Sequence, residues 1–313
     1  MSPIVESGHP DIAPPRKSAF AFFLFLMALY AGLGGTAQAR HPVLGLAWTE
    51  AFVFLLPPAL VAAGSNLRPG PFLLLSRRPT GRQLLLAAAS GVALFLAASG
   101  IMALTTLAVP RSWVDAFDVT RLFEGSRRHQ VAVALLASVA APLAEEVAFR
   151  GYVLSAFRTH LRPAAAIAGS ALLFSAMHLD PVRFPAVLFL GWMLGWMAWR
   201  SGSVWPAVIA HAVNNGIGSL VAAGAASDPA ATPTAAAALT VLAVGLGALG
   251  PLVVAWERAT PFPPDASEDR VLASPDDPSI AFRLDRVPPG WLVLAVAGLL
   301  LYGALMLLPA RTP

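Results

Sequence analysis

Side chains able to move protons or bind metals occur at only a few places inside otherwise apolar stretches of this sequence. Carboxylates and imidazoles serve as general acids and bases or as metal ligands, and amide N–H groups can stabilise a developing negative charge. Such groups are costly to place at membrane depth and are therefore candidates for catalysis, metal binding or proton transfer. The candidates, with one aromatic neighbour, are Glu145, Glu146, Arg150, Phe174, His178, His211 and Asn215.

Helical spacing separates the two adjacent carboxylates. Residues four apart lie on one helix face, whereas adjacent residues point about 100° apart. Glu146 is therefore expected to pair with Arg150 as a buried structural ion pair. The residue four positions after Glu145 is Phe149, so Glu145 has no cation on its own face and remains available for chemistry.

The composition places these residues in a membrane protein. The chain has 313 residues, of which 57% are hydrophobic and 12% charged, and its mean hydropathy is +0.68. A soluble domain could not bury so much apolar surface, whereas a bilayer accepts it. The net charge of +4 comes from basic residues that lie mostly between apolar runs, which indicates topology anchors and not a nucleic-acid surface. The absence of cysteine excludes disulfides, thiolate metal sites and a cysteine nucleophile.

The apolar runs predict an all-α, polytopic transmembrane helix bundle of about eight to nine spans. The predicted spans are 18–36, 44–64, 84–109, 130–148, 164–178, 184–199, 204–223, 234–256 and 290–308. Three regions follow, which are N-terminal transmembrane helices and loops at 1–129, a core at 130–222 that holds the candidate residues, and C-terminal helices at 223–313 with a polar linker at 257–288. The first run ends in Thr-Ala-Gln-Ala, so a cleaved leader is the alternative to a retained helix.

The basic residues also predict the orientation of the bundle. They are more numerous in the loops on the N-terminal side, which places the N-terminus in the cytoplasm. The fourth and fifth spans are expected to form a hairpin near 161–163, with Pro163 in the first turn of the second helix. Glu145 and His178 then lie at matched depth, about 25 Å from that turn. If residues 150–162 project from the membrane as a helical extension, the site opens toward the cytoplasm.

Three short motifs resemble those of the CPBP family of intramembrane proteases, which includes type II CAAX prenyl endopeptidases and Abi bacteriocin-processing or immunity proteins. The EExxxR motif of that family matches Glu145, Glu146 and Arg150. Its FxxxH motif matches Phe174 and His178, and its HxxxN motif matches His211 and Asn215. The resemblance covers about residues 130–222, and the flanking helices share only their hydrophobicity with the family.

The resemblance implies an intramembrane endopeptidase that hydrolyses a membrane-associated, possibly lipidated, protein or peptide. Glu145, with His178, would activate a water molecule, and His211 and Asn215 would serve the oxyanion, without a cofactor. The alternative is a Zn²⁺ enzyme in which Glu145, His178 and His211 are the ligands, although no HExxH motif is present. A transporter or a non-catalytic immunity protein remains a further alternative.

The same resemblance suggests where the protein acts and on what. We expect an integral protein of a bacterial inner (cytoplasmic) membrane, with the lipid bilayer and a membrane-associated substrate as partners. CAAX-type termini, leader peptides and C-terminal sorting signals all suit such an enzyme.

Overall fold

All regular secondary structure is helical in the described residues of the computed structural model, which are 16–158, 160–227, 233–260 and 281–310. The first span joins α1 (Arg16–Leu29), the π-helical turn η1 (Tyr30–Gly34) and α2 (Gly35–Arg40). The second joins α3 (Pro42–Thr49), η2 (Glu50–Leu55) and α4 (Leu56–Gly64). The third is α6 (Gly81–Ala108).

The fourth span is one long helix containing two π-helical turns. It consists of α8 (Arg127–Leu135), η4 (Leu136–Ala140), α9 (Ala141–Glu146), η5 (Val147–Val153) and α10 (Leu154–Arg158). The remaining long helices are α11 (Pro163–Met177), α12 (Phe184–Ser201), α13 (Trp205–Ser227), α14 (Ala235–Ala259) and α15 (Pro289–Leu307). Short helical segments in the connections are α5 (Pro69–Phe72), α7 (Arg111–Ala116), η3 (Val119–Phe123) and η6 (Leu284–Arg286).

Each predicted apolar run overlaps one of these helices, so the predicted all-α membrane bundle is confirmed. Seven helices in the described residues are long and apolar enough to cross a bilayer. The helices α11 and α12 fall outside that group, and α11 has only 15 residues. Such short helices suit the interior of a bundle, where neighbouring helices shield them from lipid.

Local sequence signals set several helix ends. Thr80 and Gln83 form a reciprocal capping box at the start of α6. Pro163 occupies the first turn of α11, as predicted. The helix α12 ends at Ser201 and is capped by Gly202, which adopts a left-handed conformation with φ 62°.

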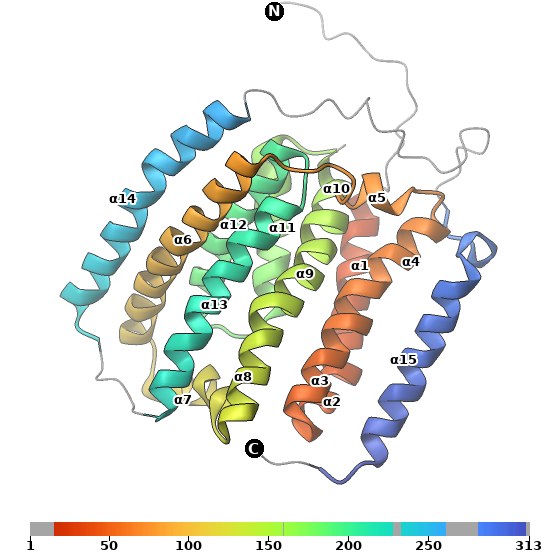
Figure 1. Ribbon diagram of the computed structural model, residues 1–313, viewed down its shortest axis with the longest axis horizontal. Coiled ribbons are helices and arrows are strands. Elements are labelled where there is room, and N and C mark those ends of the chain that lie inside the picture. Colours follow the sequence, from red (N-terminus) through yellow and green to blue (C-terminus); the bar gives the residue numbers. More distant parts are fainter. Residues whose placement is uncertain (1–15, 159, 228–232, 261–280, 311–313) are drawn as a thin grey trace, which may run out of the picture.

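The helices run roughly parallel and antiparallel, and their connections gather at two ends of the bundle (Figure 1). At one end, the backbone N–H of Val204 donates to Leu74 O at 3.0 Å, and the backbone N–H of Arg283 donates to Gly64 O at 2.8 Å. We call this the α5 end. The opposite end carries α7 and η3, and we call it the α7 end (Figure 1). The predicted grouping of loops by side agrees with this arrangement, whereas a cytoplasmic N-terminus stays a prediction. Residues 1–15, and most of the predicted linker at 257–288, lie outside the described residues.

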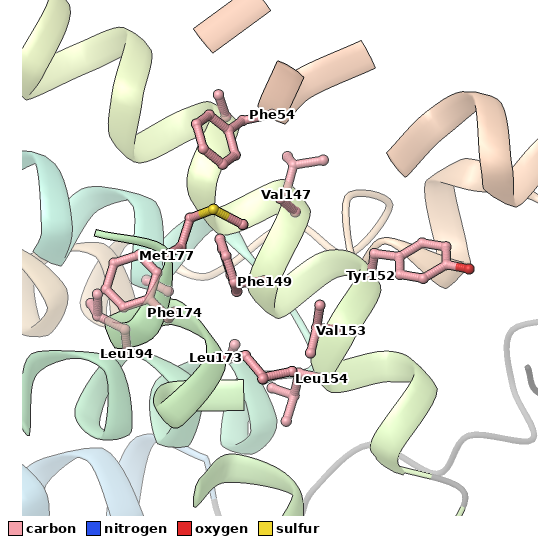
Figure 2. Close-up of a cluster of buried hydrophobic side chains, with 14 of the residues drawn as sticks. Phe54, Val147, Phe149, Tyr152, Val153, Leu154, Leu173, Phe174, Met177 and Leu194 are labelled. Carbon is pink, nitrogen blue, oxygen red and sulfur yellow. The ribbon is translucent and has the colours of Figure 1, made fainter. Parts of the chain in front are cut away.

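The region around η5 and α11 forms a densely packed core beside the candidate residues (Figure 2). The carbonyl of Phe149 accepts the backbone N–H of Leu154, five residues later, and the hydroxyl of Ser170 at 3.0 Å. A Cβ added to Gly191 would lie 3.0 Å from the Phe174 ring, so the absence of a side chain there lets α12 approach α11 closely. A Cβ added to Gly195 would lie 3.2 Å from the Ile167 side chain, so Gly195 contributes to the same close helix contact.

The topology can be tested by labelling single cysteines, because the native chain has none. Arg78 at the α5 end and Ser112 at the α7 end are both exposed. We expect an impermeant thiol reagent applied to intact cells to label Ser112→Cys but not Arg78→Cys, and inside-out vesicles to show the reverse. Labelling of Arg78→Cys from outside would contradict the cytoplasmic N-terminus.

Candidate active site

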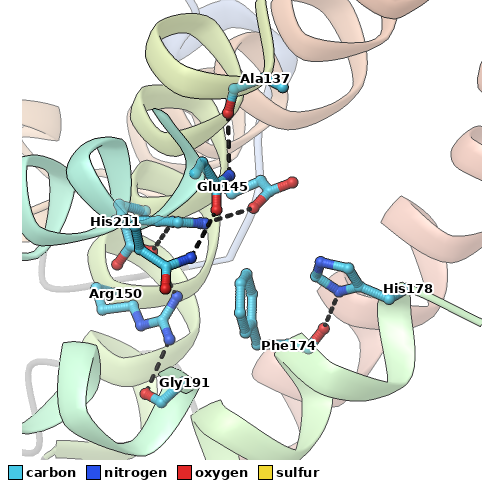
Figure 3. Close-up of polar contacts among 10 residues, drawn as sticks. Ala137, Glu145, Arg150, Phe174, His178, Gly191 and His211 are labelled. Carbon is cyan, nitrogen blue, oxygen red and sulfur yellow. Dashed lines mark hydrogen bonds and ion pairs between the residues drawn. The ribbon is translucent and has the colours of Figure 1, made fainter. Parts of the chain in front are cut away.

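Arg150 is fully buried and holds three elements of the core together (Figure 3). Its Nη1 donates to Glu146 Oε1 at 2.8 Å, which confirms the predicted ion pair. Its Nη2 donates to the carbonyl oxygen of Gly191 on α12, also at 2.8 Å. The guanidinium lies 4.3 Å from the centroid of the Phe174 ring, a cation–π contact. Arg150 therefore fixes the relative positions of η5, α11 and α12.

Glu146 connects this ion pair to His211 on α13. Its Oε1 lies 2.9 Å from His211 Nδ1. Because the same carboxylate oxygen accepts a hydrogen bond from Arg150, the His211 contact is best read as Nδ1–H donating to it. The sequence predicted only a structural role for Glu146, whereas the structure shows that Glu146 also orients a candidate catalytic histidine.

His211 then directs its second nitrogen at Glu145. The distance from His211 Nε2 to Glu145 Oε2 is 3.8 Å. The side chain of Glu145 is 16% exposed, while that of Glu146 is completely buried. The two adjacent carboxylates thus have different surroundings, as their helical positions predicted. Glu146 is buried and contacts Arg150 and His211 through Oε1, whereas Glu145 faces a cavity.

His178 is held on the other side of Phe174 (Figure 3). Its Nδ1 lies 2.9 Å from the carbonyl oxygen of Phe174. A carbonyl can only accept, so Nδ1 carries the hydrogen and a neutral ring has its lone pair on Nε2. The Phe174 ring centroid lies 4.9 Å from that of His178 and 5.8 Å from that of His211. Phe174 thus contacts both histidines and Arg150.

Asn215 is positioned by two hydrogen bonds. Its Nδ2 donates to Ala137 O in the π-helical turn η4 at 3.0 Å, and its Oδ1 accepts from Asn214 Nδ2 at 3.0 Å. The second hydrogen of Nδ2 remains available to a ligand. The π-helical turns η4 and η5 thus flank Glu145 and present carbonyls to neighbouring side chains, and such π-helical turns are frequent at functional sites.

The structure brings together all four residues to which the sequence assigned catalytic roles. Glu145, His178, His211 and Asn215 line one cavity of about 360 Å³. From these groups the cavity continues between α6 and α13, past Leu122 and Phe123 of η3 and past Arg183. It therefore extends toward the α7 end of the bundle.

Residues 150–162 were expected to project from the membrane, so that the site would open toward the α11 hairpin turn. The projection stays a prediction, but the cavity extends toward the opposite, α7 end. Residues 150–157 are buried inside the bundle. Aromatic contacts hold this stretch against α1, with ring centroids 4.0 Å apart for Phe22 and Tyr152 and 5.5 Å apart for Phe20 and Phe157. Arg150 is occupied in its buried pair and does not act as a solvated anchor.

Two further polar residues at the site were not among the candidates chosen from the sequence. Glu50 in η2 is 5% exposed and lines a smaller chamber that also contacts Glu145 and His178. Glu50 could have been identified from the sequence, because an acidic residue inside a predicted span such as 44–64 is a candidate functional residue. Arg183, five residues after His178, lines both parts of the cavity, and its Nε donates to Asp180 Oδ2 at 2.6 Å.

The same geometry bears on the zinc alternative. No group of three His, Asp or Glu side chains in the described ranges is placed to hold a metal ion. Glu146 occupies His211 Nδ1, and the Phe174 ring packs against both His178 and His211. The residues present do not form a ready three-ligand zinc site. The metal-free mechanism stays a prediction.

Comparison with known proteins agrees with the motif assignment. The sequence model of the family described as type II CAAX prenyl endopeptidase Rce1-like matches residues 127–217. Neither the curated proteins nor the solved structures gave a match. The matched segment contains every residue of the three motifs. Residues of η1, α2, α3, η2, α6 and η3 before it, and the remainder of α13 after it, complete the cavity walls. Residues 127–217 therefore carry the Rce1-like core of the CPBP family, set within a larger bundle of membrane helices.

Proposed function

We propose that this protein is an intramembrane endopeptidase in which Glu145 and His178 activate water to hydrolyse a peptide bond of a membrane-associated protein or peptide. The observation that carries the proposal is that Glu145, His178, His211 and Asn215, contributed by three helices, line one cavity within a membrane bundle. The Rce1-like match supports protease activity of the CAAX type.

The proposed reaction uses one water molecule and forms no covalent bond between enzyme and substrate. One hydrogen of the water is hydrogen-bonded to the neutral Nε2 of His178. Glu145 removes the other hydrogen as a proton while the water oxygen attacks the scissile carbonyl carbon. The carbonyl becomes a tetrahedral oxyanion. Collapse breaks the C–N bond, and the proton on Glu145 passes to the leaving amine nitrogen.

The oxyanion would be stabilised from α13. The free Nδ2 hydrogen of Asn215 is one donor. His211 can donate from Nε2 only when its ring carries both hydrogens, because Nδ1–H is bonded to Glu146. Removing a preorganised oxyanion donor costs about 3–4 kcal/mol, which corresponds to a rate loss of hundreds-fold.

Asn215 offers a test of that role. We expect Asn215→Ala to lower kcat by about 100-fold or more, with little change in KM, because the donor acts on charge that develops in the transition state. Asn214→Ala is the neighbouring control, and it should have a smaller effect because Asn214 supports Asn215 only indirectly. Equal kcat values for Asn215→Ala and wild type would remove Asn215 from the oxyanion site.

The substrate can be found by comparing protein termini in membranes. Cells carrying wild-type protein should contain cleaved termini that are lost with Glu145→Gln and retained with Glu124→Gln, a control that makes the same change at an exposed acid. The extent of the cavity toward the α7 end suggests that cleavage sites lie near that face of the membrane. Identical termini in all three strains would argue for a non-catalytic protein or a transporter.

Metal dependence can be tested separately. We expect purified protein to retain full activity after exhaustive chelation, because a carboxylate activates the water. Activity that disappears with chelator and returns with Zn²⁺ would instead support Glu145, His178 and His211 as zinc ligands.

A further inference from the structure

Glu50 is a buried acid that the proposed reaction does not use. It lies in η2, outside the segment that matches the Rce1-like family. Its Oε2 is buried and has no hydrogen-bond partner among the described residues. An unpaired carboxyl group at such a site is costly, and a cationic or hydrogen-bonding ligand would offset much of the cost.

The Glu50 side chain lines a chamber next to the catalytic groups. This side chamber has a volume of about 190 Å³ and is walled by α1–α4 residues such as Tyr30, Gln38 and Phe54. It shares Glu145 and His178 with the main cavity. A peptide whose scissile bond lies at Glu145 and His178 would therefore place a flanking residue within reach of the side chamber.

The arginine that lines the side chamber is already paired. Arg183 also lines the side chamber, but its Nε is bonded to Asp180 Oδ2. Asp180 is 5% exposed and is itself fixed, because its Oδ1 accepts the backbone N–H groups of Val182 and Arg183 at 2.9 Å. Arg183 and Asp180 thus form an ion pair with no net charge. Gln38, which also lines the side chamber, donates a hydrogen bond from Nε2 to the hydroxyl of Thr49. The lining of the side chamber thus holds the carboxyl groups of Glu50 and Glu145 and, apart from the imidazole of His178, no basic side chain other than the paired Arg183.

We propose that the side chamber is a specificity subsite for a basic side chain of the substrate and that Glu50 binds it. This inference rests on the proposed peptidase activity for its biological meaning, although the binding itself does not need turnover. An arginine or lysine would supply the missing partner of Glu50, and its aliphatic stem would pack on Phe54 and Val133. Substrates would then carry a basic residue at one fixed position from the cleavage site.

Cleavage specificity gives the first test. Purified wild-type protein, Glu50→Gln and the exposed control Glu124→Gln would each be incubated with a proteome-derived peptide library, and cleavage sites would be read by mass spectrometry. We expect wild type and Glu124→Gln to favour Arg or Lys at one position. Glu50→Gln should lose this preference, with kcat/KM for basic peptides lowered by about ten-fold or more and that for matched leucine peptides unchanged.

Two results would overturn the subsite. One is an unchanged preference in Glu50→Gln. The other is an equal loss on basic and leucine peptides, which would assign Glu50 to the reaction itself or to folding. Absence of any cleavage by wild type would count against the proposed function and leave the subsite to the binding test.

Thermal unfolding gives a test that does not depend on activity. A ligand that binds only the folded state raises the melting temperature. We expect L-arginine amide to stabilise wild type and Glu124→Gln but not Glu50→Gln, and the uncharged isostere L-citrulline amide to stabilise none of them. Equal shifts in wild type and Glu50→Gln, or no shift in any protein, would show that the chamber does not bind a basic side chain and that Glu50 is simply a buried acid.

Discussion

Replacing Glu145 by Gln is expected to reduce peptide hydrolysis by at least about 100-fold, since general-base catalysis typically contributes 10²–10⁴-fold. The amide keeps the size of the carboxylate but cannot take a proton from water. The side chain of Glu145 lines the cavity, and its nearest charged partner, His211 Nε2, is 3.8 Å away, so folding should be little affected. The measurement is kcat/KM on a peptide substrate together with the melting temperature.

His178→Ala should lower activity to a similar extent, because the imidazole Nε2 that holds the water is lost. Glu124→Gln is the control for a change of one negative charge. Turnover close to wild type in either Glu145→Gln or His178→Ala would contradict the assigned water-activating pair. A large fall in melting temperature would show that the residue is needed for folding instead.

Replacing Arg150 by Ala is expected to lower the free energy of unfolding by about 3–5 kcal/mol, because it leaves the Glu146 carboxylate buried and without its cation. The Gly191 carbonyl also loses a donor, and Phe174 loses its cation–π partner. The pair is completely buried on both sides. Activity should fall as well, because Glu146 orients His211.

The exposed pair of Arg111 and Asp115 provides a matched control. It has the same i,i+4 spacing, but its side chains are 73% and 54% exposed. Exposed pairs contribute about 0–1 kcal/mol, so Arg111→Ala should leave stability almost unchanged. Chemical unfolding or thermal melts in one detergent would compare the variants. Similarly small losses of stability in Arg150→Ala and Arg111→Ala would show that the buried Glu146–Arg150 pair contributes no more to stability than an exposed pair.

Contacts within a helix were predictable from the sequence, and contacts between helices were not. Spacing alone paired Glu146 with Arg150 and separated Glu145 from both, because i,i+4 geometry is local. The contact of Glu146 with His211 joins residues 65 positions apart. It depends on how α13 packs against the fourth span, which no periodicity encodes. The bond from Arg150 to Gly191 has the same origin.

The direction of the cavity shows a second limit. A rise of 1.5 Å per residue gives depth along a helix, but not which neighbours cover each end. Residues 150–162 looked able to project because the stretch contains three arginines. Residues 150–157 are nevertheless buried in the bundle, where aromatic side chains pack against α1. The segment η3, which lines the cavity, lies between two predicted spans. The apolar pattern of the sequence did not indicate that η3 would contact the cavity.

Glu50 illustrates a different kind of miss. It was visible as an acid inside an apolar run, but it belongs to no motif of the family resemblance. Glu50 and Glu145 line the same chamber because the second span packs beside the fourth, and this packing could not be predicted from the sequence. Acids isolated within predicted spans therefore merit the same attention as those in recognised motifs.

The most direct test of the central claim is to follow the oxygen of water into the product. Purified protein, treated with chelator, would cleave a substrate peptide in H₂¹⁸O, and mass spectrometry would examine the new C-terminal carboxylate. We expect wild type to form product with one ¹⁸O from the attacking water and Glu145→Gln to form almost none. Labelled product from Glu145→Gln at the wild-type rate would contradict the account.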